Sequence, residues 1–571
     1  MGHPTDGAAA TRREWARERL HIRLEYVLIA AVAAIIAYLA LVPLGYLLWQ
    51  AFVADGSLTL GSFSRAYAAI GLGEMALNSL WFVVGTTALS IGLGTALAYL
   101  VVRTDLPFKP LIVALTVTQL VIPGVLYTIA WIFLASPRTG ALNTLLEPLL
   151  GPGTFDIFGL RGMVVVEALH TAPFVFLLMA AAFRSMEGSL EESARVSGAG
   201  AFHVLRRITL PLLRPALYAM VLLVAIRALE SFEVPALLGI PRGVWVLTTG
   251  IWRTLTRYPV DLGAASAFAV SLLAVAAVGI FLLSRLSGHG RSFQTMTGRG
   301  VRARPVELGR WRWPAASAVL IYLTVAVVLP LLVLVYTSTQ GFYSPPTADT
   351  LSNMSLDSYA SVLSNDETAR SLRNTLALAA GTATCVVLLG AIGAWLVVRT
   401  RVRGRKVIDG LSFLPIVIPG LVLGLALLIV YVRVPLPIYG TMWILLIAYV
   451  TSGMPVGMRF SVASTHQIGD ELEEAAHVSG ASWWQTFRRV LLPLLLPALF
   501  AAWIYIFVSS ARQLSAVLVL YSPGNEVLSI RLWDQYQQGQ FAELAALGVM
   551  MTVVLVGLIA VAYKLSRRLR W

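Results

Sequence analysis

The chain has few charged residues. Asp, Glu, Lys and Arg together make up 13% of its 571 residues, whereas hydrophobic types make up 58%. A soluble domain carries roughly 25% charged residues, and a soluble protein of this size could not bury so much apolar surface. The composition therefore excludes a soluble enzyme and a disordered chain, and it indicates a protein that crosses a membrane several times.

Cysteine and lysine are also scarce. The one cysteine, Cys385, lies within an apolar run and can form neither a disulfide framework nor a cysteine-based metal site. The seven histidines are scattered and include no HExxH motif, so no metal ligands are predicted. The three lysines follow Phe108, Arg405 and Tyr563, whereas a P-loop needs Gly-Lys-Ser/Thr. No catalytic residue, ATP hydrolysis or cofactor is therefore expected in this chain.

Twelve apolar runs are long enough to cross a bilayer, which takes about 20 residues per helix. Prolines lie inside several of them, and proline is tolerated in membrane helices where neighbours satisfy the freed carbonyl groups. The sequence therefore predicts an all-α polytopic membrane protein. The runs cover residues 27–52, 80–102, 111–134, 163–183, 215–239, 263–284, 314–336, 375–398, 411–432, 439–458, 494–520 and 544–563.

The distribution of basic residues predicts the orientation of these spans. With the N-terminus inside, 31 of the 43 Lys and Arg residues fall on the inner side and 10 on the outer side, and Arg227 and Arg512 fall within spans. Cytoplasmic loops are enriched in Lys and Arg, so both termini are expected in the cytoplasm. The net charge of +14 is thus distributed over short loops, which argues against a nucleic-acid-binding surface.

The chain consists of two copies of one unit. LVVRT recurs 296 residues apart, at 100–104 and 396–400, and VIPG recurs with the same offset at 121–124 and 417–420. Residues 190–217 and 472–499, which are 282 apart, are identical at 17 of 28 positions. Because each copy has an even number of spans, the repeats are expected to be parallel, with a substrate path between the halves.

These boundaries predict five regions. They are a basic cytoplasmic tail (1–26), a first six-helix repeat (27–284), a basic cytoplasmic linker (285–313), a second six-helix repeat (314–563) and a cytoplasmic tail (564–571).

The best match between the copies lies outside the spans, in residues 187–211 and 469–493. Glu191 and Glu192 are expected to open a short helix, because the helix dipole favours carboxylates at an N-terminus. Gly198 is expected to end this helix in a sharp turn, and a second short helix should follow through Phe202 and Ile208. A membrane-surface helix would explain the basic and aromatic residues, but not Glu-Glu and Gly at one spacing in both copies. A shared docking partner would explain both.

These segments resemble the EAA motif of permease subunits in binding-protein-dependent ABC importers. Glu192-Ser-Ala-Arg-Val-Ser-Gly198 is followed after nine residues by Ile208-Thr-Leu-Pro211. The second copy reads Glu474-Ala-Ala-His-Val-Ser-Gly480, nine residues, and then Val490-Leu-Leu-Pro493. Ser193 and Val490 are small departures from the motif. The resemblance implies the type I ABC importer permease fold.

In that family the motif forms the coupling helix that sits in a groove of the ATPase, so we call 187–211 and 469–493 the coupling segments. The resemblance implies an ABC ATPase on the cytoplasmic face, which binds ATP and Mg, and an external solute-binding protein, all at a bacterial inner membrane. Two equivalent segments imply a two-fold partner, an ATPase homodimer. The expected coupling residues are Glu191, Glu192, Ala194, Gly198, Arg206 and Arg207, with Glu473, Glu474, Ala476, Gly480, Arg488 and Arg489 in the second copy.

Charged residues within spans are costly and usually functional. The run 215–239 carries Arg227, Glu230 and Glu233, and their spacing of three residues is expected to place them on one side of a helix. The run 494–520 carries Arg512 and Gln513. These five residues are expected either to line the path between the halves or, for the Arg and Glu pair, only to neutralise each other.

The same runs resemble the fused permeases of Fe(III) importers more weakly. Carboxylates would suit a hard cation, whereas the arginines would suit an anion or a metal–anion complex, and thiamine, polyamine and phosphonate importers stay open. A secondary transporter is a further alternative, although it would not need paired docking loops. The outside loops 54–78, 337–372 and 521–542 are the expected docking surfaces for a binding protein.

Overall fold

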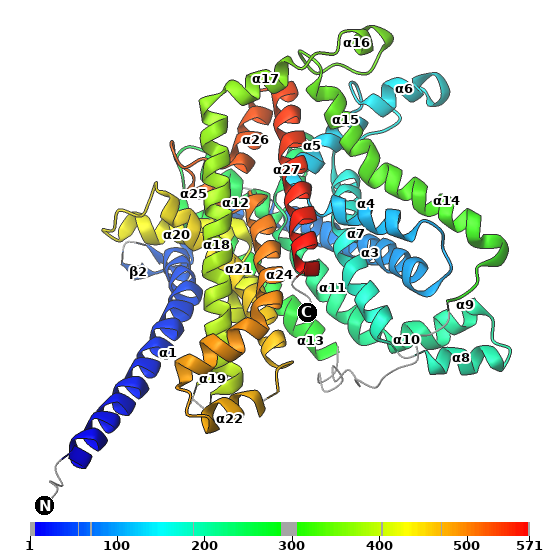
Figure 1. The fold of residues 1–571 in the computed structure, drawn as a ribbon. Helices are drawn as coiled ribbons and strands as arrows, with labels where there is room; N and C mark the ends of the chain where they lie inside the picture. Colours follow the sequence, from blue (N-terminus) through cyan, green and yellow to red (C-terminus); the bar gives the residue numbers. More distant parts are fainter. Residues whose placement is uncertain are drawn as a thin grey trace, which may run out of the picture.

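The computed structural model describes residues 6–54, 56–68, 71–186, 188–286, 305–400, 404–469 and 471–568 (Figure 1). These residues form a bundle of helices with one two-stranded hairpin, β1 and β2. The first half contains α1 (Asp6–Phe52), β1 (Val53–Ala54), β2 (Ser57–Leu58), α2 (Gly61–Ala68), α3 (Leu72–Arg103), α4 (Lys109–Gln119), α5 (Gly124–Ala135), α6 (Ala141–Leu150), α7 (Leu160–Ser185), α8 (Ser189–Val196), α9 (Ala201–Val204), η1 (Leu205–Thr209), α10 (Leu210–Leu212), α11 (Arg214–Glu230), η2 (Pro235–Gly239), η3 (Ile240–Arg242), α12 (Leu247–Thr256) and α13 (Leu262–Leu286).

The second half begins at residue 309 and repeats the order of the long helices, but its described residues include no counterpart of the hairpin or of α6. It contains η4 (Gly309–Trp311), α14 (Arg312–Leu323), η5 (Thr324–Val328), α15 (Leu329–Ser338), α16 (Ala348–Ser352), α17 (Asp357–Ser364), α18 (Asp366–Arg399), α19 (Arg405–Phe413), η6 (Leu414–Val417), α20 (Gly420–Arg433), α21 (Met442–Thr465), α22 (Glu471–Val478), α23 (Trp483–Thr486), η7 (Phe487–Leu491), α24 (Leu492–Ala511), α25 (Val517–Leu520), α26 (Leu528–Gln537) and α27 (Phe541–Arg568).

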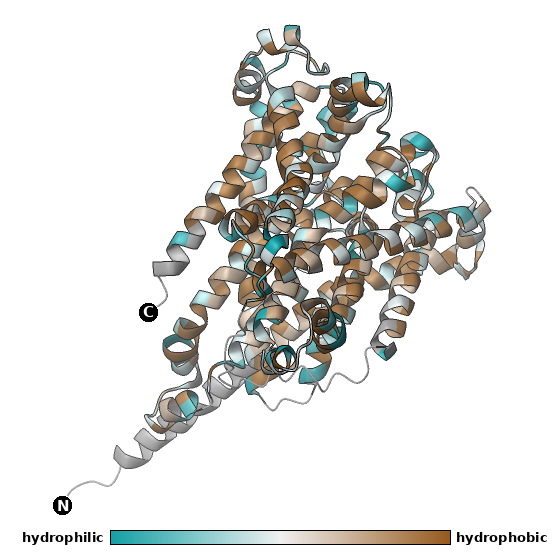
Figure 2. Cartoon of the chain, turned by 90° about the vertical axis from the view of Figure 1, so that its right-hand side faces the viewer, coloured by the Kyte–Doolittle hydropathy of each residue, from teal (hydrophilic) through white to brown (hydrophobic). Residues whose placement is uncertain are grey.

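The predicted number of spans is confirmed. In the described part of the chain, nine helices are long and apolar enough to cross a membrane, and twelve spans result if three bent helix pairs count as one each. Large apolar side chains remain exposed on the long helices, including Trp81 (58%), Leu388 (56%) and Val553 (64%). Hydrophobic residues are spread over the outer helices in Figure 2, as expected for surfaces that face lipid.

Two of the predicted runs, 111–134 and 411–432, are not continuous helices. α4 and α5 meet at 104°, and the helix 405–417 meets α20 at 108°. Both breaks occur at the repeated VIPG sequence, where Pro123 (φ −57°, ψ 142°) and Pro419 (φ −54°, ψ 143°) have nearly the same extended backbone. Proline disfavours helical geometry in the residue before it and donates no backbone hydrogen bond. The repeated motif therefore marks a helix break in each half.

Two other runs are shorter than predicted. Helix α11 ends at Glu230 instead of continuing to 239, and α24 ends at Ala511 instead of 520.

The expected second short helix of the coupling segment is also interrupted, because α9 covers four residues and passes into the wider turn η1. Most of the predicted linker, 287–304, lies outside the described residues, as do 1–5 and 569–571 of the predicted tails.

Each half places its first helix against the other half. Helix α1 packs on α19 and α20 of the second half, and α15 packs on α5 of the first half. Within each half the long helices pair in the same way, α3 with α7 and α11, and α18 with α21 and α24. An aromatic cluster of Phe232, Trp252 and Trp533 joins the halves. The two halves therefore form one interlocked bundle.

The beginning of the second half is attached to the end of α3. Val306 pairs with Thr104 in a short parallel bridge, and Leu308 donates its backbone N–H to the carboxylate of Asp105 at 2.9 Å. The described end of the predicted linker thus lies beside the first coupling segment, at the end of the bundle that carries α8 and α22 (Figure 1). We call this the α8/α22 end. Helices α6, α16 and α17 lie at the opposite end.

Candidate functional site

Both coupling segments form a short helix that ends at a glycine. Helices α8 and α22 are each eight residues long and carry acidic residues in their first turn, as predicted. Gly198 and Gly480 have φ angles of +88° and +80°, which residues with a side chain rarely adopt. The following N–H groups of Ala199 and Ala481 bond back to the helix carbonyls at 3.0 Å. This is a helix end closed by a left-handed residue, and it turns the chain sharply.

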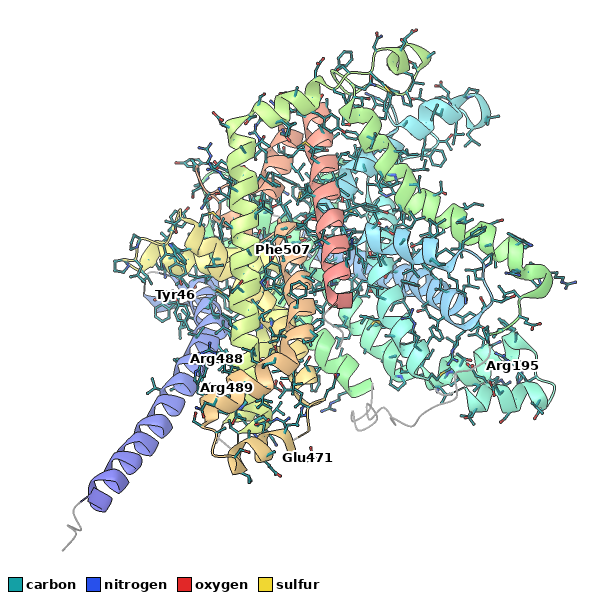
Figure 3. All side chains as sticks on the ribbon, in the orientation of Figure 1. Tyr46, Arg195, Glu471, Arg488, Arg489 and Phe507 are labelled. Atoms are coloured by element: carbon teal, nitrogen blue, oxygen red, sulfur yellow. The ribbon has the colours of Figure 1, made fainter. Side chains whose placement is uncertain are left out.

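The outer surface of each segment combines exposed apolar side chains with arginines. Val196 and Val478 are each 90% exposed, and Phe202 (74%) and Trp484 (49%) follow them after the turn. The predicted pairs Arg206–Arg207 and Arg488–Arg489 are exposed beside them. Figure 3 shows Arg195 on α8 and Arg488, Arg489 and Glu471 on the second segment at the same end of the molecule. An apolar centre with a basic rim is typical of a protein-docking surface.

The remaining predicted coupling residues differ in exposure. Glu474 is exposed, whereas Glu192, Ala194 and Ala476 are half-buried. Glu191 is buried, with 3% of its surface exposed. It therefore faces the bundle rather than the docking surface.

The inward carboxylates bind arginines from the LVVRT repeat. An Nη1 atom of Arg103 lies 3.6 Å from Oε2 of Glu191, and Nε of Arg399 lies 2.7 Å from Oε1 of Glu473. Sequence reasoning noticed LVVRT as a repeat but assigned no role to its arginine. The signal was available, because LVVRT is a repeated basic motif that ends a predicted span in both copies.

The charged residues predicted for the path lie at the ends of α11 and α24. Glu230 closes α11, but Glu233 lies beyond it, so the two do not share a helix face as predicted. Arg512 and Gln513 follow the end of α24. The backbone carbonyl of Gln513 accepts hydrogen bonds from Tyr449 (2.9 Å) and Ser529 (2.8 Å), which fixes the turn at this helix end.

Four of these five residues, all half-buried, belong to one electrostatic cluster. Arg227 interacts with Glu230 and also lies 4.4 Å from the ring centre of Phe174. Arg512 interacts with Glu233 and Arg227, and it donates a hydrogen bond to the carbonyl oxygen of Leu120. The cluster thus connects the end of α24 in the second half with the broken helix α4–α5 in the first.

Sequence reasoning missed two members of this region. Glu167 of α7 is 7% exposed, accepts a hydrogen bond from Ser231 at 2.8 Å and interacts with Glu230 and Glu233. His170, one turn further, stacks on Tyr127 at 5.2 Å. Glu167 lies in the predicted run 163–183, so the rule that charges within spans are functional could have found it.

The arrangement is a mixed-charge network and not a metal cage. Among the described residues, no three His, Cys, Asp or Glu side chains are placed to hold a metal ion together. Three carboxylates and two guanidinium groups instead lie together, one of them buried and four half-buried, and partners of opposite sign stabilise charges in such a place. Such a network can exchange partners when the halves move.

Relatives of known name were found along most of the chain. It is 27% identical over 430 residues to the ferric transport system permease protein FbpB of Actinobacillus pleuropneumoniae, covering 74% of this chain and 61% of the relative. It is 29% identical over 401 residues to a putative ferric transport system permease protein FbpB 1 of Haemophilus influenzae, covering 69% and 62%. The chain thus spans about three-fifths of the length of these two relatives.

A third relative is matched over nearly its whole length. The probable ABC transporter permease protein y4fN of Sinorhizobium fredii is 26% identical over 554 residues, covering 94% of this chain and 96% of the relative. The profile of one family, described as binding-protein-dependent transport system inner membrane component, matches twice, at residues 88–290 and 386–571. The two matches fall in the two halves, and with the duplicated coupling segments and twelve apolar spans they place this chain in the family of binding-protein-dependent transport system inner membrane components.

Proposed function

We propose that this chain is the transmembrane permease of an ATP-driven ABC importer, and that the solute it passes is ferric iron delivered by an external binding protein. The observation that carries the importer role is the pair of equivalent coupling segments, both exposed at the α8/α22 end. Their exposed apolar tips fit grooves on a partner that is itself two-fold, an ATPase homodimer. ATP and Mg are bound by that partner and not by this chain.

This proposal implies which end of the bundle faces which side of the membrane. The α8/α22 end faces the cytoplasm, because the basic loops gather there, and both termini are proposed to lie on the cytoplasmic side of the membrane. The opposite end, with α16 and α17 in the predicted loop 337–372, faces the binding protein. No nucleic acid partner is proposed.

The conformational change of the ATPase reaches the membrane helices through the coupling segments. Closure of the ATPase dimer on ATP draws the two segments together, so the halves rock and access changes from the outer to the inner side. Glu192 and Glu474, with Gly198 and Gly480, carry the contact and the turn that presents it.

The route runs between the halves, past Arg227, Glu230, Glu233, Arg512 and Gln513, with Glu167 as a further wall residue. Ferric iron is a hard cation that prefers oxygen donors such as carboxylates. Because two guanidinium groups hold these carboxylates, the ion meets oxygen donors without a closed cage, which suits passage rather than storage. The named ferric relatives support this choice of solute.

Reconstitution tests the proposal. The full chain is placed in proteoliposomes with its ATPase and binding protein, and uptake of radioactive ferric iron is measured with and without ATP. ATP-dependent uptake that disappears when the ATPase is omitted is the expected result. Iron movement driven by an ion gradient without the ATPase would overturn it.

A further inference from the structure

We infer that Arg103 and Arg399 are positioning residues for energy coupling: each one fastens the coupling segment of its half to the end of a long membrane helix, so that the segment and the helix move together. This inference rests on the proposed function, since it concerns how the ATPase stroke reaches the membrane helices.

In the first half, the side chain of Arg103 joins three elements. It ends α3, forms the 3.6 Å ion pair with Glu191 on α8, and donates from Nη2 to the carbonyl oxygen of Met186, just after α7, at 3.1 Å. Both charged side chains are less than 10% exposed. The second oxygen of Glu191 accepts a hydrogen bond from Thr209 of η1 at 2.5 Å. The coupling segment is therefore held at α8 and at η1, on both sides of the turn at Gly198.

The second half contains the same arrangement of an arginine that pairs with a coupling-segment glutamate and bonds to backbone carbonyls, which we call the clasp. Arg399 ends α18 and pairs with Glu473 of α22 at 2.7 Å. Its Nη2 donates to the carbonyl oxygens of Thr465, the last residue of α21 (3.2 Å), and of Ile468 (2.5 Å). Leu491 occupies the position of Thr209, 282 residues later, so the hydroxyl bond is absent there. The second clasp has instead the shorter ion pair and one more carbonyl contact.

The recurrence argues for a shared role. Arg399 is 296 residues after Arg103, whereas Glu473 is 282 residues after Glu191. The chain between the two motifs thus differs by 14 residues between the copies, yet the same two side chains meet in both. A pairing that survives a change in the intervening loop is a feature of the folded unit rather than of local sequence.

The chemistry suits a rigid joint. The planar guanidinium group directs several N–H donors in fixed directions, which a lysine cannot do. Because the first pair is buried and the second is only 10% and 16% exposed, loss of one partner leaves the other charge without compensation in a site of low polarity. Each arginine also belongs to the helix that packs along the centre of its half, α3 on α7 and α11, and α18 on α21 and α24. A displaced segment must therefore carry this helix with it.

The test measures coupling and not only activity. Arg103→Gln and Arg399→Gln are made in the full chain, which is reconstituted with its ATPase and binding protein. Ferric iron supplied on the binding protein is the probe, and uptake and ATP hydrolysis are measured together. Arg184→Gln is the control, because Arg184 lies in the last turn of α7 and is exposed.

We expect ATPase binding and hydrolysis to persist while iron transported per ATP falls about tenfold, within the usual range of coupling free energies. Arg184→Gln should leave this ratio unchanged. The exchanged pair Arg103→Glu with Glu191→Arg should recover part of the ratio. Should a glutamine variant fail to reach the membrane, Arg103→Lys and Thr209→Val test the same clasp with smaller changes.

The outcomes separate the two proposals. If the unchanged chain shows ATP-driven uptake and the variants keep the normal ratio, or lose uptake and hydrolysis in proportion, the arginines have no special part in coupling and the inference is wrong. If the unchanged chain moves iron without the ATPase, the proposed function fails and the inference fails with it.

Discussion

Arg512, which follows α24 in the second half, donates a hydrogen bond to the backbone carbonyl of Leu120, which follows α4 in the first. Glu233 accepts a hydrogen bond from the backbone of Val125, in the first turn of α5. The two ends of the broken helix α4–α5 therefore meet charges of the appropriate sign. An arginine satisfies a free carbonyl group at a helix C-terminus, and a glutamate satisfies a free N–H group at an N-terminus.

Replacement of Arg512 should destabilise the junction between the halves. Arg512→Ala leaves the Leu120 carbonyl without its donor and removes the positive charge that interacts with Glu233, and we expect a loss of about 3 kcal/mol. Thermal unfolding of the purified chain in detergent measures this as a lower Tm. Arg373→Ala, an exposed arginine on α18, is the control. Equal Tm values for the two variants would show that the contact does not hold the halves together.

A methyl group at Gly124 should be harmful for a defined reason. A Cβ atom built at this position would lie 2.1 Å from Oε2 of Glu233. Gly124→Ala must therefore displace the carboxylate from the backbone N–H of Val125, and we expect a cost of about 1–3 kcal/mol from the lost hydrogen bond. Gly92→Ala is the control, since a Cβ there meets no atom within 4 Å.

A double variant separates the steric effect of a methyl group at position 124 from the role of the Glu233 carboxylate. Gly124→Ala combined with Glu233→Ala removes the collision but also the counter-charge of Arg512, so the stability of the double variant should equal that of Glu233→Ala alone. Iron uptake should stay low if the carboxylate serves the path. Normal uptake in the double variant would remove Glu233 from the proposed route.

The left-handed turn of the coupling segment offers a closely matched pair of substitutions. Gly198 has a φ of +88°, so Gly198→Ala should cost about 1 kcal/mol and shift the exposed tip of the segment. Gly200, two residues later, has a φ of −69° and open space around it, so Gly200→Ala should be tolerated. The measurement is the amount of ATPase subunit that stays bound to the reconstituted chain. The prediction fails if both variants retain equal amounts.

Sequence patterns predicted the parts of the molecule that depend on local properties. Span number follows from run length, and the turn at Gly198 follows from the need for a positive φ angle. The helix breaks at Pro123 and Pro419 were missed, although VIPG was seen twice, because a proline within an apolar run is compatible with either a kinked span or a broken one.

Long-range pairings could not be predicted in this way. Nothing in the spacing of Arg103 and Glu191 shows that they meet, because 88 residues separate them and the contact depends on how α3 packs on α7. Glu230 and Glu233 were expected on one helix side because their spacing of three fits a helix. The chain leaves the helix at Glu230, where Ser231 turns to bond Glu167.

The exchange of first helices predicts that the halves assemble without a covalent link. Tyr38 of α1 and Tyr431 of α20 share a hydrogen bond of 2.7 Å, and Tyr343 donates to the carbonyl oxygen of Phe133 across the halves at 2.8 Å. Val306 also docks on α3 through backbone groups that persist if the chain is cut before it.

Fragments 1–290 and 291–571, co-expressed with a tag on the first, should therefore purify together from mild detergent. Nearly all the packing between the halves is kept in the cut chain, and loop length adds little to stability by itself. Arg512→Ala in the second fragment should reduce the recovered amount, because it removes a contact between the halves. Recovery of the tagged fragment alone would mean that the covalent linker, and not the interlocked helices, holds the bundle together.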